Sequence, residues 1–269
     1  MKIGNREFDT KTHTYIMGIL NVTPDSFSDG GKWNDYDAAM RHTEEMINCG
    51  CDILDVGGES TRPGHCQISV EEEIYRVSPL IEAVKKNFDV PVSVDTYKSA
   101  VAEAAIRSGA DMVNDIWGFL YDDHMASVVK KYDVACCLMH NRKEAVYENF
   151  IEDMCLDLKK CINAAKAVGI SDEKIILDPG VGFGKTYEMN LDVMKHLDRF
   201  SELGYPMLLG TSRKSMIGLT LDLPVTEREE GTLVTTVLAV QSGYGFVRVH
   251  DVEKNRRAIC MTEAILRRA

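Results

Sequence analysis

The chain of 269 residues is 45% hydrophobic and 27% charged, proportions typical of a globular protein with a sizeable core. Its formal net charge of −11 and its isoelectric point near 5.2 argue against a protein that binds the nucleic-acid backbone, because such proteins present a basic face. Neither a secretory signal nor a membrane span is apparent, and the eight cysteines form no zinc-binding pattern, so we expect reduced cysteines in the cytoplasm.

Short apolar and β-branched runs recur along the chain, separated by segments with helical periodicity. Strands are expected, in chain order, at residues 15–21, 53–57, 92–95, 112–115, 135–139, 175–178, 207–210 and 246–250. Eight successive βα units of about 30 residues are typical of a (β/α)8 TIM barrel, an α/β fold. An open, doubly wound sheet is the alternative, since the number of strands does not exclude it. No linker interrupts the chain, so we expect a single domain over residues 1–269.

The last predicted helix, residues 252–267, has apolar and basic residues on opposite sides. It is expected to turn Ile259, Ile265 and Leu266 toward the barrel. Its basic residues are expected to remain in solvent.

Polar side chains occur at the C-terminal end of nearly every predicted strand. They are Asn21, Glu59 with Thr61, Asp95, Asn114, Asp178, Lys214, Arg248 and His250. The C-terminal ends of all the strands of a barrel meet at one mouth, where the active sites of such barrels lie. Taken singly, a strand-terminal Asp or Asn is often only the N-cap of the next helix. Their occurrence together at so many strand ends favours a binding site.

Asp95, Asn114, Asp178 and Lys214 have the chemistry to surround one flat heterocycle in the mouth. Carboxylates accept hydrogen bonds from ring N–H and amine groups, Asn donates and accepts, and Lys donates to a carbonyl or ring nitrogen. A 2-amino-4-oxo ring needs this combination. A buried ion-pair network without a ligand is the alternative, but such networks cost desolvation and seldom add stability.

Arg248 and His250 lie two residues apart on the last predicted strand and therefore point to the same face. Closure of the barrel would place that strand beside the first, which ends at Asn21. Two cationic or hydrogen-bonding side chains beside an amide form an anion site. A histidine that is satisfied within a loop is the alternative for His250 taken alone.

The segment DPGVGFGKT, residues 178–186, looks like a phosphate-binding P-loop because it is rich in glycine and ends in Gly-Lys-Thr. In the pattern G-x-x-x-x-G-K-[ST], however, Pro179 takes the place of the first glycine, and proline has no amide hydrogen to donate. The spacing of Gly180, Gly182 and Gly184 does not match the dinucleotide pattern G-x-G-x-x-G either. The Gly-Lys-Thr is therefore expected to be incidental.

Two loops, residues 21–33 and 57–66, are rich in Gly, Pro, Ser and Thr. Because they have little apolar surface to bury, we expect them to be mobile lids over the mouth. Ordinary surface turns are the alternative. Phe27, an aromatic residue in a polar loop, and Arg62 before Pro63 favour closure over a ligand.

Seven motifs follow one another in the order ILNVTPDSFSDGG, DVGGESTRPG, SVDTYK, NDIWG, LDPGVGFGKT, GTSRKS and RVHDV. Together they resemble those of the dihydropteroate synthase family of the folate pathway, from about residue 15 to residue 252. The resemblance implies a (β/α)8 barrel that condenses 6-hydroxymethyl-7,8-dihydropterin diphosphate with p-aminobenzoate by a dissociative substitution, releasing diphosphate and using Mg²⁺. It also implies a homodimer, and residues 232–241 are apolar enough to contribute to the interface. The segment LMHNRKEAVYENF departs from the family pattern, which is expected to change local shape only.

The resemblance further implies roles for individual residues. The pterin ring would be held by Asp95, Asn114, Asp178 and Lys214, with Arg248 stacked against it. The diphosphate would be bound by Asn21, Thr61, Arg248 and His250, and Asn21 would reach the Mg²⁺. The p-aminobenzoate would contact Thr61, Arg62, Pro63, Phe183, Ser212 and Lys214. The residues expected to assist the reaction are Asp95, Lys214, Arg248 and His250.

Two other functions share parts of this pattern. A pterin methyltransferase working with a corrinoid protein would be similar in its pterin-binding residues but should lack TPDSFSDGG. A non-catalytic paralogue that binds pterin for regulation or assembly is the second. Intact loops and the presence of Asn21, Arg248 and His250 disfavour both. The expected partners are small-molecule substrates, not nucleic acid or a membrane.

Overall fold

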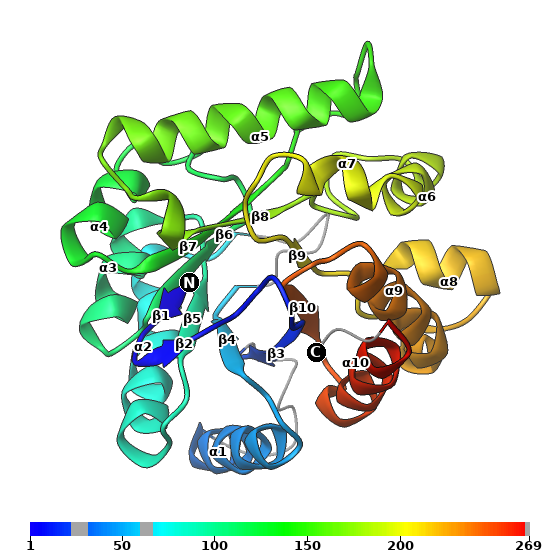
Figure 1. The fold of residues 1–269 in the computed structure, drawn as a ribbon. Helices are drawn as coiled ribbons and strands as arrows, with labels where there is room; N and C mark the ends of the chain where they lie inside the picture. Colours follow the sequence, from blue (N-terminus) through cyan, green and yellow to red (C-terminus); the bar gives the residue numbers. More distant parts are fainter. Residues whose placement is uncertain (23–31, 60–66, 267–269) are drawn as a thin grey trace.

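The computed structural model describes residues 1–22, 32–59 and 67–266, which contain a ring of parallel strands with helices outside it (Figure 1). The strands of the ring are β3 (Tyr15–Asn21), β4 (Ile53–Gly57), β5 (Val92–Asp95), β6 (Met112–Asp115), β7 (Ala135–Met139), β8 (Ile175–Asp178), β9 (Leu208–Leu209) and β10 (Phe246–Val249). They pair in the order β8-β7-β6-β5-β4-β3-β10-β9, and a parallel bridge from Leu177 to Met207 joins β8 to the start of β9. The closed ring confirms the predicted (β/α)8 barrel and excludes the open, doubly wound sheet.

Six of the predicted strands have the bounds seen in the structure, and the last two are shorter than predicted. Beyond Leu209 and Val249 the backbone bonds to side chains instead of to a neighbouring strand. The His250 amide donates to the Ser212 hydroxyl at 3.2 Å, and the Arg213 amide donates to the Thr232 hydroxyl at 3.1 Å. The predicted bounds at residues 207, 210 and 250 are wrong, since β9 spans only Leu208–Leu209 and β10 ends at Val249.

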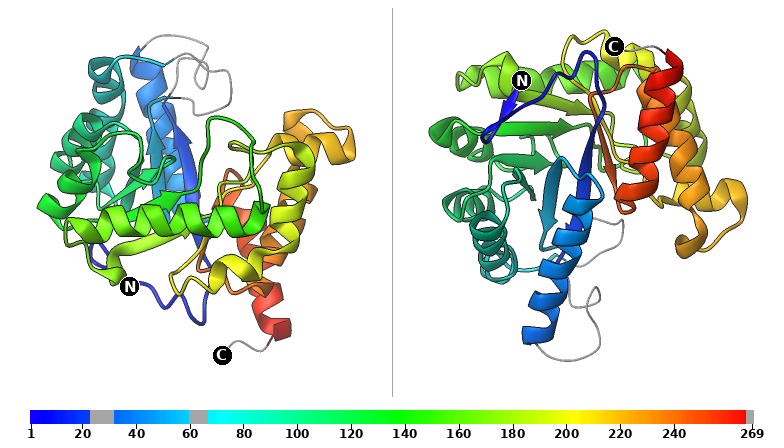
Figure 2. Two further views of the ribbon diagram at one scale, coloured as in Figure 1. Left: turned by 90° about the horizontal axis from the view of Figure 1, so that it is seen from above. Right: turned by 60° about the horizontal axis from the view of Figure 1, so that its bottom comes forward.

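The helices follow the strands along the chain and cover the outside of the barrel, as both views in Figure 2 show. They are α1 (Lys32–Asn48), α2 (Val70–Asn87), α3 (Ser99–Arg107), α4 (Met125–Tyr132), α5 (Phe150–Ala167), α6 (Tyr187–Lys195), α7 (Leu197–Ser201), α8 (Ser215–Leu221), α9 (Glu229–Gln241) and α10 (Val252–Leu266), with 3-10 turns at Asp172–Lys174 and Val225–Glu227. Within the described ranges, none of the helices has the length and apolar character needed to cross a membrane.

Helix α2 illustrates how the sequence starts and stops these helices. The Ser69 hydroxyl caps its first turn by accepting a hydrogen bond from the Glu72 amide at 3.1 Å. Acidic residues fill its first turn, and Lys85 and Lys86 occupy its last, so that both ends complement the helix dipole. The helix then packs its apolar side against the barrel.

Strand residues alternate between the helix layer and the barrel interior, as the two-residue period of a strand requires. Val92 and Val94 of β5 belong to the large core between the strands and the helices. Met17, Ile53 and Phe246 belong instead to the apolar cluster inside the ring. Farther along the strands the interior positions become polar, so the barrel is apolar inside at one end and polar at the mouth.

A short hairpin closes the N-terminal end of the barrel. It pairs β1 (Lys2–Ile3) with β2 (Arg6–Glu7), and Ile3 and Phe8 pack against the apolar cluster inside the ring. The predicted elements have no counterpart to this hairpin, because two-residue strands are too short to show alternation. The hairpin seals the end of the barrel that lies opposite the mouth.

The orientation predicted for the last helix is wrong in its final turn. In α10 the buried residues include Val252, Asn255 and Ile259, whereas Ile265 is 67% exposed and Leu266 is 41% exposed. The contact between α10 and the barrel ends before the helix does. The final turn therefore leaves apolar side chains on the surface.

Candidate functional site

The four residues predicted to surround a ring converge at the mouth of the barrel. Asp95 and Asn114 are register partners at the ends of β5 and β6, Asp178 ends β8, and Lys214 immediately precedes α8. The two carboxylates and the amide are each only 5% exposed. The Lys214 ammonium interacts electrostatically with Asp178 and Asp95. The four side chains therefore share one space.

Arg248 lies inside the same cluster and is held by two carboxylates. Its Nε donates to Asp55 Oδ2 and its Nη2 to Asp95 Oδ2, both at 2.6 Å. Asn114 Nδ2 donates to the same Asp55 oxygen at 3.1 Å. In this structure the guanidinium is thus oriented across the barrel toward β4 and β5 rather than toward an anion at the end of β10.

Asp55 is a member of this cluster that the sequence analysis missed. It is fully buried in the middle of β4, one interior position before Gly57. A signal for it exists in the sequence, because a carboxylate at an interior position of an otherwise apolar strand needs a cation or a ligand. Its partner Arg248 is 193 residues away in the chain, so only the closed ring identifies the pair.

The Arg248 cluster leaves two acceptor oxygens unused. Asp95 Oδ1 and Asp55 Oδ1 are buried, and neither has a hydrogen-bond partner within the described part of the chain. Burial raises the pKa of Asp95 to about 7, against the effect of Arg248, which lowers it. A buried carboxylate oxygen without a donor is costly, so a ligand that brings an N–H group to Asp95 would relieve that cost.

Lys214 and Phe183 form the second half of the mouth. The Lys214 ammonium lies 4.6 Å from the centre of the Phe183 ring and donates to the Val181 carbonyl oxygen. Burial lowers the pKa of Lys214 to about 8, although Asp178 opposes this shift. Asp178 Oδ1 accepts from the Gly180 amide at 2.7 Å, and burial raises the pKa of this carboxyl group. A cation, a carboxylate and an aromatic face therefore adjoin one another.

The glycines of residues 178–186 serve close backbone packing. Gly180 and Gly184 have φ values of +66° and +56°, and a Cβ at either position would collide with the carbonyl group of His140 or Arg142. The Gly-Lys-Thr of this segment has a structural role, since Lys185 donates to the carbonyl oxygens of Gly180 and Phe183. The Thr186 hydroxyl caps α6 by accepting from the Met189 amide.

The residues predicted to form an anion site lie around the junction of β10 and β3. The two strands pair in parallel, with Arg248 opposite Met17, as barrel closure predicts. His250 Nδ1 lies 2.9 Å from the Ser212 hydroxyl, which is nearly buried. The Asn21 side chain lies beside Gly57, its register partner on β4. His250, Ser212 and Asn21 thus occupy the ends of neighbouring segments of the mouth.

Part of the predicted site falls on loops outside the described residues. Thr61, Arg62 and Pro63 belong to these stretches, as does Phe27. The structure corrects one boundary, because residues 32 and 33 belong to the first turn of α1 and not to the first loop.

Glu59, at the start of the second loop, is held by hydrogen bonds to neighbouring side chains. It accepts hydrogen bonds from Lys98 Nζ at 2.7 Å and from the Tyr97 hydroxyl at 2.6 Å. Lys98 Nζ also donates to Glu73 at 2.8 Å. The Glu59 carboxylate is therefore committed to anchoring the chain where the second loop begins.

Apolar side chains line the mouth between these polar groups. Ile116 and Met139 form a cluster with Tyr97, and Trp117 and Phe183 pack against it. Of these residues only Phe183 is predicted from the sequence, because the others lie at or just beyond strand ends that look like ordinary core. A space with apolar walls, inward carboxylates and a lysine suits a flat ring that carries both hydrogen-bond donors and acceptors.

Comparison with known proteins agrees with this geometry. Residues 17–250 match the family model described as Pterin binding enzyme. A dihydropteroate synthase of Clostridium beijerinckii is 63% identical over 100% of both chains. The solved structure of a Clostridium difficile dihydropteroate synthase in the presence of pteroic acid has a TM-score of 0.95 at 51% identity, covering 97% of this chain and 100% of that one. A Xanthomonas albilineans dihydropteroate synthase with 4-aminobenzoic acid has a TM-score of 0.90 at 40% identity, covering 94% and 93% of the two chains. The chain therefore belongs to the dihydropteroate synthase family of pterin binding enzymes, which are transferases.

Proposed function

We propose that this enzyme condenses 6-hydroxymethyl-7,8-dihydropterin diphosphate with p-aminobenzoate to give 7,8-dihydropteroate and diphosphate. One observation carries the proposal: Asp95 Oδ1 is a buried acceptor with no donor among the described residues. Asn114 is the register partner of Asp95, and Lys214 interacts with both Asp95 and Asp178. The amino and N–H groups of a pterin ring supply the missing donors, while Lys214 donates to the carbonyl or ring nitrogen. The flat ring also fits the apolar walls of the mouth.

The second substrate is assigned to the side of the mouth where Lys214 lies over Phe183. An aromatic ring and a carboxylate match an aromatic wall and a neighbouring cation. Ser212 adjoins this side, and Thr61, Arg62 and Pro63 are assigned to it through their motif alone. The similar Xanthomonas protein whose structure is described with 4-aminobenzoic acid supports p-aminobenzoate as the second substrate.

The diphosphate is assigned to the junction of β10 and β3. His250 and the Asn21 side-chain amide line that junction, Arg248 is added to the set from β10, and Thr61 is assigned to it through its motif alone. In this assignment Arg248 serves two groups, since it also holds Asp55 and Asp95. The extended guanidinium can lie against the pterin ring while it neutralises charge on the leaving diphosphate.

Magnesium fits this junction only as an ion shared with the substrate. In the described ranges no group of three or more His, Cys, Asp or Glu side chains could hold a metal ion. The side-chain oxygen of Asn21 is a hard ligand of the kind that Mg²⁺ prefers. The ion ordinarily keeps several waters and binds substrate phosphates. Bound there, Mg²⁺ would help to neutralise the leaving diphosphate.

The reaction is proposed to be a substitution at the methylene carbon of the pterin. Asp95 and Lys214 hold the ring so that its electrons can support positive charge on that carbon as diphosphate departs, which favours a dissociative route. Arg248 and His250 stabilise the charge that develops on the leaving group. The neutral arylamine then attacks without a strong base, and an apolar, enclosed mouth protects the cationic carbon from water.

The expected result is diphosphate release that depends on both p-aminobenzoate and Mg²⁺, measured by a coupled phosphate assay on the purified chain. A corrinoid-dependent methyltransferase would release no diphosphate, and a non-catalytic pterin-binding paralogue would bind the pterin without turnover. Release at the same rate without p-aminobenzoate would contradict the proposed condensation, because it would identify the enzyme as a hydrolase of the pterin diphosphate.

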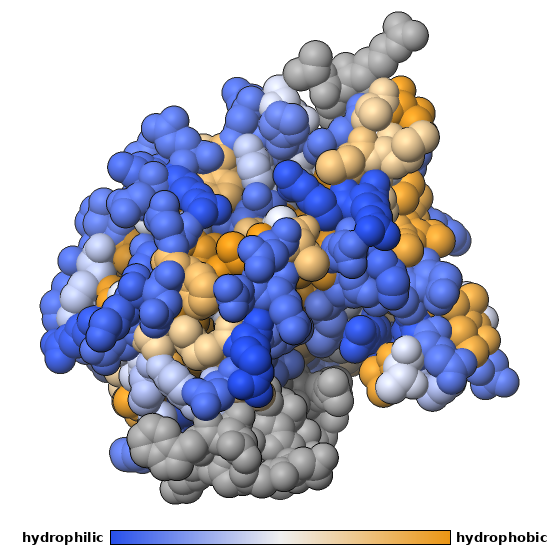
Figure 3. Space-filling view, turned by 90° about the horizontal axis from the view of Figure 1, so that it is seen from below, coloured by the Kyte–Doolittle hydropathy of each residue, from blue (hydrophilic) through white to orange (hydrophobic). Residues whose placement is uncertain are grey.

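A homodimer formed through the side of the molecule made by α8, α9 and α10 is also proposed. Val234 of α9 is 61% exposed and Met261 and Ile265 of α10 are 62% and 67% exposed. Figure 3 shows hydrophobic residues gathered along this side of the molecule. Sedimentation equilibrium should give twice the chain mass, and V234E/I265E should give the monomer mass.

The cytoplasm is the proposed location, in keeping with the free cysteines of the described part of the chain.

A further inference from the structure

Lys185 is an enclosed cation that the proposed mechanism does not use. Its ammonium lies 2.8 Å from the Gly180 carbonyl oxygen, 2.9 Å from the Phe183 carbonyl oxygen and 2.9 Å from His140 Nδ1. Three acceptors match the three hydrogens of an ammonium group. Burial lowers the pKa of Lys185 to about 7, while Asp178 raises it. All three hydrogens of the ammonium are thus engaged, two by the turn that carries Lys185 and one by His140.

The turn held by Lys185 carries several groups of the mouth. The Gly180 amide donates to Asp178 Oδ1 at 2.7 Å. The Val181 carbonyl oxygen accepts from Lys214, and the Phe183 ring lies under the same ammonium. Because Lys185 bonds to the carbonyl groups of residues 180 and 183, it ties both ends of this segment to one point. The position of Lys214 therefore depends on a residue that does not face the mouth.

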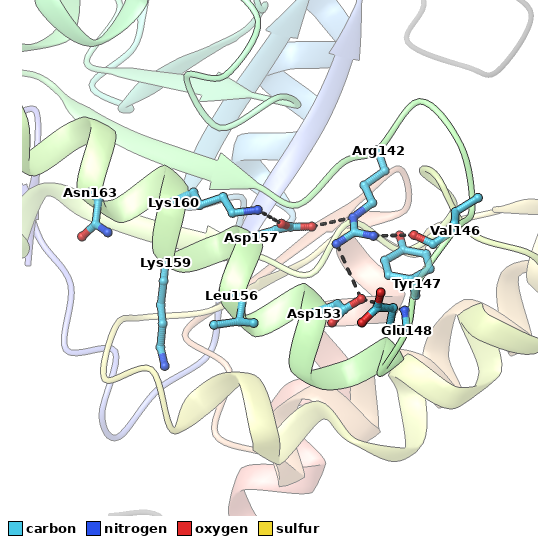
Figure 4. Close-up of a pocket in the computed structure, with 10 residues that line it drawn as sticks. All are labelled: Arg142, Val146, Tyr147, Glu148, Asp153, Leu156, Asp157, Lys159, Lys160 and Asn163. Carbon is cyan, nitrogen blue, oxygen red and sulfur yellow. Dashed lines mark hydrogen bonds and ion pairs between the residues drawn. The ribbon is translucent and has the colours of Figure 1, made fainter.

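The far side of Lys185 is supported by His140 and, behind it, by a group of charged side chains. His140 is fully buried, with Nε2 lying 3.3 Å from Asp157 Oδ2. Asp157 is held in turn by Arg142 at 2.6 Å and by Lys160 at 2.7 Å, as Figure 4 shows at a hollow beside α5. The ion pairs of Asp157 hold its carboxylate beside His140 Nε2. Burial lowers the pKa of His140 to about 4, so the neutral ring can accept from Lys185 through Nδ1. The turn is thereby linked to α5, an element that contributes no residue to the predicted site.

We propose that Lys185 is a positioning residue for the p-aminobenzoate side of the mouth, setting the turn of residues 180–183 so that Lys214 and Phe183 meet. The inference rests on the proposed function. Asp178 belongs to the β7–β8 ladder and is fixed largely without the turn. Lys214 and Phe183 have no such support from a strand. Loss of Lys185 should therefore disturb p-aminobenzoate more than the pterin.

Lys185→Met, which keeps the length of the side chain and removes the ammonium, tests this inference. We expect the KM for p-aminobenzoate to rise about tenfold, the scale of lost hydrogen bonds to a charged group. The KM for the pterin diphosphate should change by less than about threefold, because its binding groups do not depend on the turn. The matched control is Tyr147→Phe, because the Tyr147 hydroxyl donates to the Gly184 carbonyl oxygen at 2.7 Å, at the outer end of the same turn. The control should leave both KM values nearly unchanged.

Three results would overturn the inference. The first is an unchanged KM for p-aminobenzoate in folded Lys185→Met, measured beside a wild-type chain that is active. The second is an equal rise of both KM values, and the third is an equal effect of Tyr147→Phe, since each would indicate general loosening. If Lys185→Met does not fold, Lys185→Gln is measured in the same way and judged by the same results. A wild-type chain without p-aminobenzoate-dependent release would refute the proposed function itself and the inference with it.

Discussion

Replacing Arg248 with methionine is expected to lower kcat/KM by about 100- to 1,000-fold, the cost of removing a group that stabilises developing charge. It should also lower the free energy of unfolding by about 3–5 kcal/mol, because one partner of a buried ion-pair network is lost. Without Arg248, the carboxylates of Asp55 and Asp95 stay buried close together with no cation between them. Urea denaturation and diphosphate release measure the two effects separately.

The double variant R248M/D55N is the control for the loss of stability. It removes one of the two carboxylates that have lost their cation, so it should recover part of the free energy of unfolding while activity stays low. Recovery of activity together with stability would show that Arg248 acts only as a structural counter-ion. A folded Arg248→Met chain within about 1 kcal/mol of the wild type would contradict the argument from burial.

In contrast to Arg248→Met, Asp95→Asn should raise the free energy of unfolding. It should nevertheless weaken pterin binding. The cluster of Asp55, Asp95 and Arg248 has two negative charges and one positive charge, and Asp95→Asn leaves the balanced pair of Arg248 with Asp55. The pterin loses a charged acceptor, so its affinity should fall by about 10- to 100-fold, as for a hydrogen bond to a charged group. Calorimetric titration with a pterin measures the affinity, and thermal unfolding measures the stability.

The stability gain of Asp95→Asn should depend on pH. Burial raises the pKa of Asp95 from its ordinary 3.8 to about 7, so in the wild type ionisation of Asp95 costs folding free energy. That cost is fully present above about pH 7 and is relieved as the pH falls from 7 toward 4. The variant carries no such cost, so its advantage in Tm should be largest at pH 8 and should shrink at pH 5.

Asp115→Asn is the matched control for this prediction. Burial also raises the pKa of Asp115, to about 6, but its two oxygens accept from the amides of Trp117 and Phe119, both at 2.8 Å. Asparagine can accept only one of these hydrogen bonds, so this variant should lose stability at pH 8, where Asp115 is ionised. A loss of stability in Asp95→Asn at pH 8 would show that its charge is better compensated than the geometry indicates.

Much of the architecture can be predicted from the sequence because it depends on local patterns. Short apolar and β-branched runs locate the strands, and the polar residues at their ends identify Asp95, Asn114 and Asp178 as neighbours once a barrel is assumed. The predicted ends of strands are less accurate where the backbone bonds to a side chain instead of to the next strand, as at His250. The last turn of α10 is also misjudged, because periodicity shows which residues share a face but not where the contact with the barrel ends.

The amino-acid sequence by itself determined the barrel, the mouth and the set of groups available to bind a pterin. The tertiary structure alone decided which of those groups are already engaged. Asp55 and Arg248 meet only because the ring closes and sets the register across β10, β3 and β4. Lys185 turns inward only because the backbone of the β7–α5 connection lies against its turn. Such contacts join residues far apart in the chain, and their energies depend on burial and distance, neither of which a local pattern contains.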